Sequence, residues 1–272
     1  MTPALNGATR IIAIVGDPIA QVKSPAGVTQ ALIGRGCNAV VVPMHVAPKS
    51  FDAFMQGLAV AQNVDGIIAT IPHKFSAYTH CASASERARL LGAANILRRN
   101  PDGTWHGDML DGAGFVAAIQ RAGCIAQGRR ALLAGAGGAG SAIAAALLEA
   151  GVSELAVHDP DAQRRGDLLR RLARVSGANL SVGFADPSGF DIVVNASPVG
   201  MGASDAVPVD AHRLAPHMFV GDVITEPEVT PLLAAARRLG CGTSTGVDMF
   251  RQVQELMVEF LRASGPLAPP VT

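Results

Sequence analysis

The sequence lacks the features that mark nucleic-acid-binding, membrane-surface and secreted proteins. Its 272 residues carry 22 Lys and Arg against 22 Asp and Glu, and this zero net charge offers no basic field to nucleic acid or to an anionic membrane. Aromatic residues make up only 4%, and no basic stretch has aromatics interleaved for base stacking. The first ten residues, MTPALNGATR, contain no apolar signal core, so we expect a cytoplasmic protein.

The cysteines and histidines follow no pattern of a disulfide framework or a metal centre. The four cysteines lie far apart with no C-x-x-C pair, which is typical of reduced thiols (Cys37, Cys81, Cys124 and Cys241). None of the seven histidines belongs to an H-E-x-x-H motif, so we expect no metal. Residues 242–246, GTSTG, match the G-x-S-x-G motif of serine hydrolases, but no histidine follows Ser244, which excludes that class.

What the sequence does contain is the composition of a packed α/β protein. Hydrophobic residues make up 49% and charged residues 16%, as in a globular chain with a large core. An uncharged run at 131–148, ALLAGAGGAGSAIAAALL, has the length of a membrane helix. Its four glycines and its weakly apolar alanines instead indicate a strand, a glycine turn and a helix, and we expect no membrane span.

Strand patterns alternate with helix patterns along most of the chain. Apolar strand patterns begin near residues 10, 39 and 67 and again near 131, 154, 191 and 218. Helix patterns lie between them, including one with Ser50 as a plausible N-cap and one over residues 228–239. Turn residues at 101–105 indicate a small hairpin. This alternation predicts parallel α/β layers. We predict a two-lobed protein with an α/β substrate domain (1–108), onto which helix 247–265 packs back, and a doubly wound Rossmann dinucleotide-binding domain (109–246).

The segment GAGGAG at 135–140 has the G-x-G-x-x-G spacing at Gly135, Gly137 and Gly140. Between a strand and a helix, such glycines let the backbone approach a pyrophosphate, and the helix N-terminus supplies free N–H groups. A tight turn without a ligand is the alternative, but the context favours a dinucleotide. The predicted cofactor loop comprises six residues (Gly135, Ala136, Gly137, Gly138, Ala139 and Gly140).

Asp159 ends the next strand, close to the offset of about 20 residues at which an acidic residue binds the ribose 2′-OH of NAD. It would also repel the 2′-phosphate of NADP, so the sequence predicts NAD in preference to NADP. Arg164 and Arg165 lie inside the following helix and are weaker phosphate candidates. A simple helix cap before Pro160 is the alternative role for Asp159, and His158 beside it is a candidate for the adenine pocket.

The apolar run VDGIIATIPHK ends at Lys74. A lysine at this place is either solvated beyond the end of a strand or held at the mouth of a cleft. The run alone leaves both alternatives open.

Seven separated stretches resemble motifs of the shikimate/quinate dehydrogenase family, in the same order. They are GDPIAQVKSP (16–25), IIATIPHK (67–74), GAANIL (92–97), GDMLDGAGF (107–115), GAGGAGSA (135–142), NASPVGM (195–201) and GVDMF (246–250). The resemblance implies that Lys74 and Asp111 form the catalytic pair and that Lys74 lies in a cleft. Oxidation of a secondary alcohol needs such a group to take the hydroxyl proton while hydride passes to the cofactor.

The resemblance also implies the rest of the site. The substrate residues it implies are Ser24, Thr70 and Asn95, with Thr225 and Gln252 at further substrate positions. The residues it places around the nicotinamide are Ser197, Val199, Val223, Gly246 and Met249.

Several substrate positions depart from the family pattern. Val22 replaces a serine, Thr225 replaces a tyrosine, and Gln252 stands one position early for the family's glutamine; the other replacements are Ile68 and Met109 for asparagines, Leu110 for a threonine and Asp248 for a glycine. A site with fewer hydrogen-bonding groups cannot grip a polyhydroxylated acid in the same way.

The expectation is therefore an NAD-dependent dehydrogenase that interconverts a ring secondary alcohol and its ketone, of the shikimate or quinate type with an altered substrate. Its partner would be a small cyclic hydroxy acid, and the chain would be a monomer or a homodimer. The alternative is a catalytically weak NAD-binding sensor or regulatory protein of the same fold.

Overall fold

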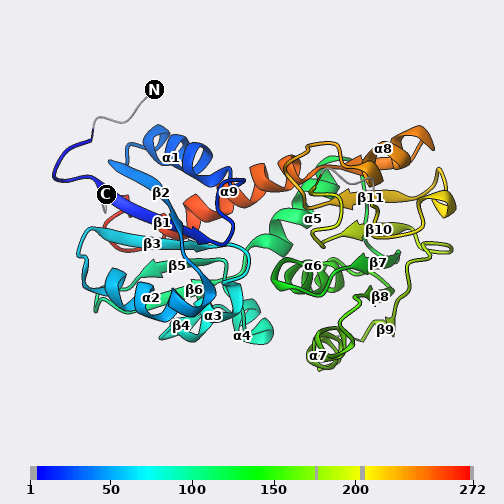
Figure 1. The fold of residues 1–272 in the computed structure, drawn as a ribbon, viewed down its shortest axis with the longest axis horizontal. Coiled ribbons are helices and arrows are strands. Elements are labelled where there is room, and N and C mark those ends of the chain that lie inside the picture. The colour runs from blue at the N-terminus through cyan, green and yellow to red at the C-terminus, as the bar shows by residue number, and fades with distance from the viewer. Residues whose placement is uncertain (1–4, 175–176, 203–205, 270–272) are drawn as a thin grey trace. The chain divides into compact units, whose positions relative to one another are not determined.

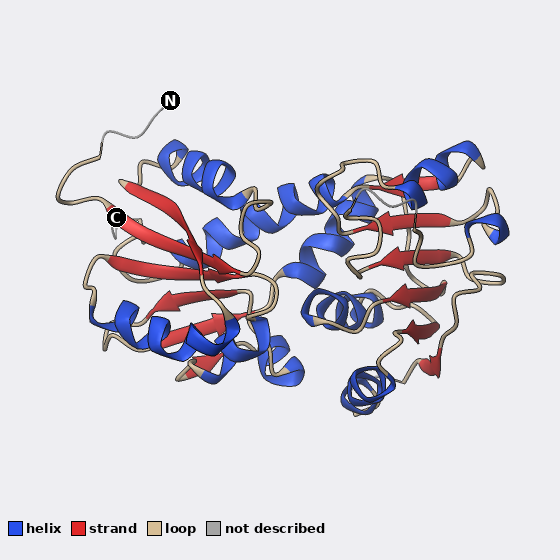
Figure 2. Ribbon diagram, viewed as in Figure 1, coloured by secondary structure: helices blue, strands red, loops and turns tan. Residues whose placement is uncertain are grey.

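The computed structural model describes residues 5–174, 177–202 and 206–269. The chain divides into two compact units, one formed by Met1–Leu110 with Val253–Thr272 and the other by Asp111–Gln252. Each unit contains one six-stranded sheet covered by helices (Figures 1 and 2). The predicted α/β class is confirmed, and each unit is described in turn.

The sheet of the first unit has the strand order β2-β1-β3-β5-β6-β4. Strands β1, β2 and β3 run parallel, β5 pairs antiparallel with β3 and β6, and β4 runs parallel to β6. The hairpin expected at residues 101–105 joins β5 to β6. The strands are β1 (Arg10–Gly16), β2 (Ala39–His45), β3 (Val64–Ala69), β4 (Ser83–Ala84), β5 (Ile96–Arg99) and β6 (Trp105–Asp108).

Helices cover both faces of this first sheet. Its helices are α1 (Ser24–Gly34), the 3-10 turn η1 (Pro48–Ser50), α2 (Phe51–Val60), α3 (Lys74–Thr79) and α4 (Glu86–Leu91), with the second half of α9 (Gly246–Arg262). Phe51 and Met55 of α2 pack into a core with Val15 and Ile67 of the central strands. Strands β1 and β3 are mostly apolar, and the one acidic residue of β3, Asp65, is paired with Arg10, so both strands can be buried between two helical layers.

The sheet of the second unit is parallel throughout and has the order β12-β11-β10-β7-β8-β9. The order reverses at β7, as in doubly wound nucleotide-binding sheets. The strands are β7 (Arg130–Ala134), β8 (Glu154–His158), β9 (Asn179–Val182), β10 (Ile192–Asn195), β11 (Phe219–Asp222) and β12 (Gly242–Ser244).

The helices of the second unit are α5 (Asp111–Arg121), α6 (Gly138–Glu149), α7 (Ala162–Leu172), the 3-10 turn η2 (Ala211–Arg213), α8 (Pro231–Arg238) and the first half of α9. Helix α6 follows the glycine turn and is uncharged up to its last residue, Glu149. No described helix combines the length and the apolarity needed to cross a membrane.

Two local expectations differ from the structure. Ser50 does not cap α2 with its side chain, because η1 has already begun at Pro48 and Ser50 itself has helical dihedral angles. The helix expected from residue 228 begins only at Pro231, where Thr230 accepts a hydrogen bond from the Leu233 backbone and so serves as the N-cap.

Candidate functional site

The glycine turn between β7 and α6 has the geometry of a phosphate cradle. Gly135 has φ = +104°, and a Cβ there would lie 2.8 Å from the Ala196 backbone. A Cβ on Gly140 would lie 1.9 Å from the Gly135 carbonyl oxygen. A Cβ on Gly137, the N-cap of α6, would meet no described heavy atom within 4 Å. Two glycines are therefore required by the turn itself, and the third leaves open space at a helix N-terminus, which fits a pyrophosphate group.

Asp159 is turned inward and is bonded to the protein backbone. Its Oδ2 accepts a hydrogen bond from the Ala136 N–H of the glycine turn at 2.7 Å, and its Oδ1 accepts one from the Asp161 N–H at 2.8 Å. The residue is 4% exposed. Both carboxylate oxygens thus hold the turn and the start of α7.

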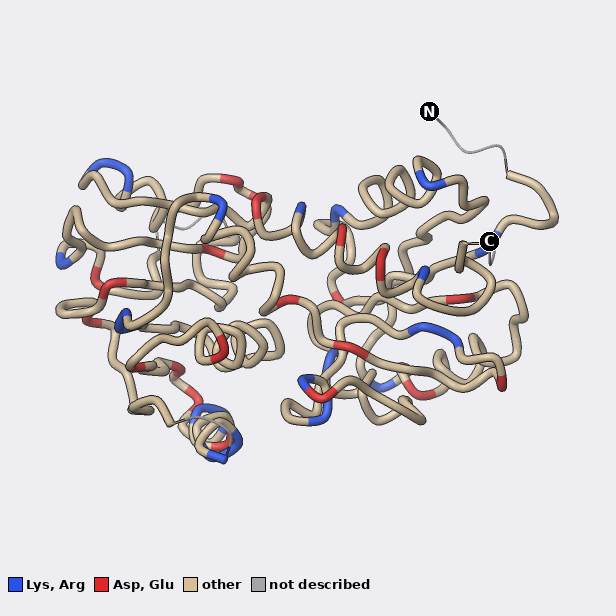
Figure 3. The backbone as a smooth tube through the Cα atoms, turned by 180° about the vertical axis from the view of Figure 1, so that it is seen from behind, with Lys and Arg blue, Asp and Glu red and all other residues tan. Residues whose placement is uncertain are grey.

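Two arginines gather at the carboxyl end of β8. Arg164 lies 3.8 Å from Asp159 Oδ2 and keeps its side chain 53% exposed, and Arg165 donates to the Asp159 carbonyl oxygen at 2.8 Å. Figure 3 shows that Lys and Arg positions concentrate along α7, which carries both of them. His158, the adenine candidate, is half-buried beside them, and its carbonyl oxygen accepts a hydrogen bond from Gly135 N–H.

The residues expected around the nicotinamide come from two adjacent strand ends and from the start of α9. Ser197 and Val199 follow β10, and Val223 follows β11, with its N–H donating to the Asn195 carbonyl oxygen at 3.0 Å. Because β10 and β11 are parallel neighbours, these loops lie at the same sheet edge as the glycine turn.

Helix α9 begins with a reciprocal cap. Thr245 Oγ1 accepts from the Asp248 N–H at 3.1 Å, and Asp248 Oδ2 accepts from the Thr245 N–H at 3.0 Å. Gly246 and Met249 are buried in this first turn, and Gln252 is half-buried one turn later. Asp248, which departs from the family motif, therefore has a structural role of its own.

In the first unit, Lys74 begins α3 directly after a buried histidine that sequence reasoning missed. His73 stacks on Phe51 with ring centroids 4.5 Å apart, and its Nε2 donates to the Val46 carbonyl oxygen at 2.7 Å. Burial lowers the pKa of His73, so the ring is neutral at pH 7. This ring is held on both sides, so it fixes the backbone at the start of α3, where the half-buried Lys74 lies. The signal in the sequence was a histidine among apolar neighbours at a strand end.

Three expected site residues of the first unit come together through backbone bonds. The Lys74 carbonyl oxygen accepts from Ala94 N–H, and the Asn95 carbonyl oxygen accepts from Ala69 N–H, both at 2.9 Å. Thr70 directly follows Ala69. Ser24 lies buried at the start of α1, which follows β1, the parallel neighbour of β3. The structure thus gathers Ser24, Thr70, Lys74 and Asn95 near the carboxyl edge of the first sheet.

The segment that leads to Asp111 is anchored by groups that the sequence did not reveal. Asp108 accepts two bonds from the Arg87 guanidinium, at 2.7 and 2.6 Å, and one from Met109 N–H at 2.7 Å. Burial raises the pKa of Asp108, but the bonds from Arg87 and from Ser85 outweigh it and lower that pKa overall. Asn95 Oδ1 holds the next backbone group, Leu110 N–H, at 2.9 Å. Asp111 then begins α5 and is buried.

Five residues that depart from the family's substrate motifs are buried to different extents. Ile68, Met109 and Leu110 are buried core residues, while Val22 is half-buried in the loop before α1. Thr225 is half-buried after β11 in the second unit. Of these five positions, Val22 and Thr225 are thus the accessible departures from the family pattern.

Ser244, the serine of the excluded hydrolase motif, is buried on β12, and its Oγ has no hydrogen-bond partner among the described residues. Among these same residues, no three His, Cys, Asp or Glu side chains form a group that could hold a metal ion.

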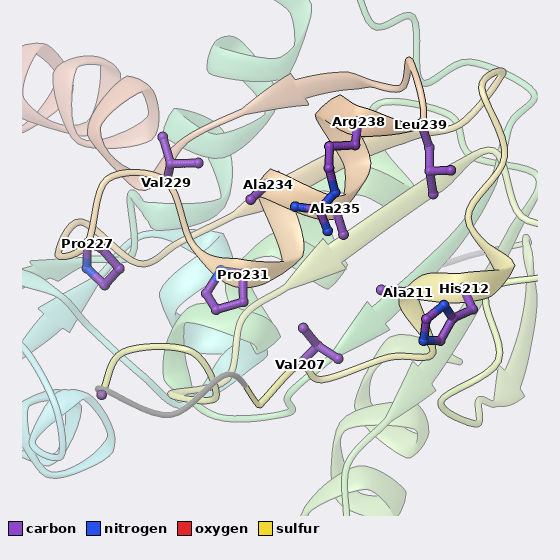
Figure 4. Close-up of a pocket in the computed structure, with 11 residues that line it drawn as sticks. Val207, Ala211, His212, Pro227, Val229, Pro231, Ala234, Ala235, Arg238 and Leu239 are labelled. Carbon is purple, nitrogen blue, oxygen red and sulfur yellow. The ribbon is translucent and has the colours of Figure 1, made fainter.

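A hollow of about 760 Å³ lies beside α8 in the second unit (Figure 4). Its lining is mostly apolar and also includes His212 and Arg238. It contains none of the residues expected to bind cofactor or substrate.

A doubly wound parallel sheet with an open glycine turn at a helix N-terminus defines a dinucleotide-binding unit, and with a second α/β unit it gives the scaffold of a two-domain dehydrogenase. Residues 14–97 match the family model of the shikimate dehydrogenase substrate binding domain. A shikimate dehydrogenase (NADP(+)) of Rubrobacter xylanophilus is 37% identical over 90% of this chain and 87% of its own length.

Solved structures agree with the sequence comparison. A shikimate 5-dehydrogenase of Listeria monocytogenes, in complex with shikimate and NAD, is 25% identical with a TM-score of 0.86, over 98% of this chain and 96% of its own. The ligand-free 5-ketofructose reductase of a Gluconobacter strain is 27% identical with a TM-score of 0.82, over 94% of each chain. The chain belongs to the shikimate dehydrogenase family of oxidoreductases, which confirms the resemblance of its seven motifs.

The expected preference for NAD over NADP is wrong. The Rubrobacter relative and three others at 33–34% identity are all named as NADP(+) enzymes. The expectation assumed that the Asp159 carboxylate faces the ribose. In the structure both of its oxygens accept backbone hydrogen bonds instead, and an exposed arginine stands beside it.

Proposed function

We propose that the chain is an NADP-dependent dehydrogenase that interconverts a ring secondary alcohol and its ketone, with Lys74 and Asp111 as the acid–base pair. The observation that carries the proposal is the glycine turn, whose open side at Gly137 fits the pyrophosphate of a dinucleotide. Family membership supports the reaction type, because the family's named relatives are dehydrogenases.

Bound NADP⁺ would supply the hydride acceptor. In the oxidation direction the substrate carbon gives up its hydride, and the Lys74 amine takes the hydroxyl proton as the C=O bond forms. Asp111 is the second group of the pair, as the family motif implies. The immobilised His73 and the bonded Thr70–Lys74 segment hold the lysine backbone in place for this proton transfer.

The Arg164 guanidinium is the group that we propose for the 2′-phosphate of NADP. It lies at the carboxyl end of β8, where the ribose of a doubly wound domain binds, and it is exposed. A guanidinium matches the geometry of a phosphate group. Arg165 stands next to it and adds positive charge at the same strand end.

We further propose that the preferred substrate carries fewer hydroxyl groups than shikimate. Val22 presents no hydrogen-bonding group where the family has a substrate-binding serine, and Thr225 is shorter than the family's tyrosine. Each lost hydrogen bond to a charged or buried group costs about 1.5–3 kcal/mol. Two such losses would lower kcat/KM for shikimate by roughly 10²–10⁴-fold.

The proposal is tested by steady-state turnover with NADP⁺ on shikimate, quinate and less hydroxylated ring alcohols, read by absorbance of the reduced cofactor. Lys74→Ala should lower kcat by roughly 10²–10⁴-fold, the usual contribution of a positioned acid–base group. Lys49→Ala, at an exposed lysine of the same unit, is the matched control and should behave like the parent. Equal turnover by both variants would remove Lys74 from the mechanism.

The substrate panel also separates the alternatives. A kcat/KM for shikimate near roughly 10⁵ M⁻¹ s⁻¹, ordinary for an enzyme, would refute the altered preference. Tight NADP binding without turnover of any alcohol in the panel would favour the sensor instead.

A further inference from the structure

A buried polar cluster joins the ends of β10 and β11 and has no part in the proton transfer proposed above. Asn195 and Asp222 are register partners at the last positions of these strands, and both are completely buried. Asn195 Nδ2 donates to Asp222 Oδ2 at 3.1 Å, and Thr230 Oγ1 donates to the same oxygen at 2.8 Å.

The cluster fixes both loops that are expected to border the nicotinamide. Asn195 Oδ1 accepts from the Ser197 N–H and hydroxyl at 3.0 and 2.7 Å, and its Nδ2 also donates to the Val199 carbonyl oxygen at 3.0 Å. On the other strand, Asp222 Oδ1 accepts from the Ile224 N–H at 3.0 Å, directly after Val223. One carboxylate thus links three separate segments of the chain.

A neutral side chain cannot make the same set of bonds. Among the described ion pairs Asp222 has no cationic partner. Burial raises its pKa overall, although the bonds from Ile224, Asn195 and Thr230 oppose this shift. An asparagine in its place would offer one acceptor oxygen and one NH₂ donor. That NH₂ group would face either the Ile224 N–H or the Asn195 amide, so one donor would be left unpaired in the interior.

We propose that Asp222 is a positioning residue for hydride transfer, which holds the Ser197–Val199 and Val223–Ile224 loops in the geometry that receives the nicotinamide half of the cofactor. The inference rests on the proposed NADP-dependent function. The adenine half binds elsewhere in that proposal, at the glycine turn and the end of β8. Loss of Asp222 should therefore weaken the binding of the nicotinamide half and leave the binding of the adenine half nearly unchanged.

The test compares Asp222→Asn with the parent by calorimetry with 2′,5′-ADP and with NADP⁺, and by steady-state kinetics. We expect the dissociation constant of 2′,5′-ADP to change less than about twofold. The dissociation constant of NADP⁺ and its KM should rise at least about fivefold, and kcat should fall at least about tenfold. Asp191→Asn is the matched control, because Asp191 accepts from the Arg130 N–H at the opposite end of β10.

A second pair of variants keeps the test decisive if Asp222→Asn does not fold. Thr230→Val removes one donor to the carboxylate and should show a smaller loss in the same direction, and Thr230→Ser should recover most of it. The inference is overturned if Asp222→Asn or Thr230→Val keeps the parent's NADP⁺ affinity and kcat, or loses 2′,5′-ADP binding to the same degree. A parent protein that binds neither ligand overturns the proposed cofactor as well.

Discussion

Replacing Asp159 by asparagine tests whether this side chain holds the glycine turn or selects the cofactor. The carboxylate accepts from Ala136 N–H and from Asp161 N–H, one bond on each oxygen. An asparagine has a single acceptor oxygen, so one of these two N–H groups would face an NH₂ donor. The change therefore disturbs either the turn or the start of α7, whichever way the amide is turned.

The size of the effect follows from the bond that is lost. A hydrogen bond to a charged group contributes about 1.5–3 kcal/mol, and an affinity changes about tenfold for each 1.4 kcal/mol. Part of the loss lowers the stability of the unit, so we expect Asp159→Asn to weaken dinucleotide binding by about tenfold. Because we propose that the turn binds the pyrophosphate, which both cofactors share, the affinities for NADP⁺ and NAD⁺ should fall equally.

Calorimetry with both cofactors checks this expectation. Asp167→Asn removes the same charge from a site further along α7, where Asp167 pairs with Arg170, and serves as the control. Arg164→Ala is the complementary change, which should weaken NADP⁺ at least about tenfold and leave NAD⁺ within about twofold. If Asp159→Asn shifts the ratio of the two affinities by more than about tenfold, the carboxylate does act on the ribose, and its inward bonds do not describe its role.

Three further changes probe the scaffold. Arg99 donates to five backbone carbonyl oxygens at the end of α2, the start of β3 and the turn between β5 and β6. Arg99→Met should therefore cost about 3 kcal/mol and lower Tm by about 6–12 °C, read by calorimetry, and an unchanged Tm would contradict this. Because the folded pKa of Asp108 is lowered, its contribution to stability is present above the unfolded value of about 3.9 and is lost as pH falls below it. Urea unfolding between pH 6 and 3 should show this loss in the parent and a flatter profile in Asp108→Asn. Ser244→Ala removes a buried hydroxyl that has no described partner and should be neutral or slightly stabilising, whereas a loss above about 1 kcal/mol would reveal a bond to it.

Local signals predicted the scaffold well. Central strands such as β1 and β7 are apolar after their first residue, and the glycine turn follows β7, so neighbours along the chain were enough to identify them. The short edge strand β9 carries only four half-buried or exposed residues and gives no such signal. Ser50 was misread as an N-cap because a helical turn has already begun at Pro48, two positions before it.

The sequence alone could not predict which way the polar side chains point. The partner that decides the role of Asp159 is Ala136, which comes close only after β7 and β8 pair. The partner of Asp108 is Arg87, on a separate helix, and the partner of Asp222 is Asn195, on a neighbouring strand. Each pairing depends on tertiary structure, so a motif position alone indicates which residue type is present and not which way it points.

The role of a residue that departs from the family motifs depends on whether its side chain can still form hydrogen bonds. Asp248 departs from the family pattern, yet it accepts a hydrogen bond from the Thr245 N–H and supports the start of α9. A polar replacement can take up such a role because it still accepts hydrogen bonds. Val22 cannot, since its side chain has neither donor nor acceptor. We therefore expect the chain to keep hydride transfer, while the missing hydrogen-bonding group at Val22 changes the preferred substrate as proposed above.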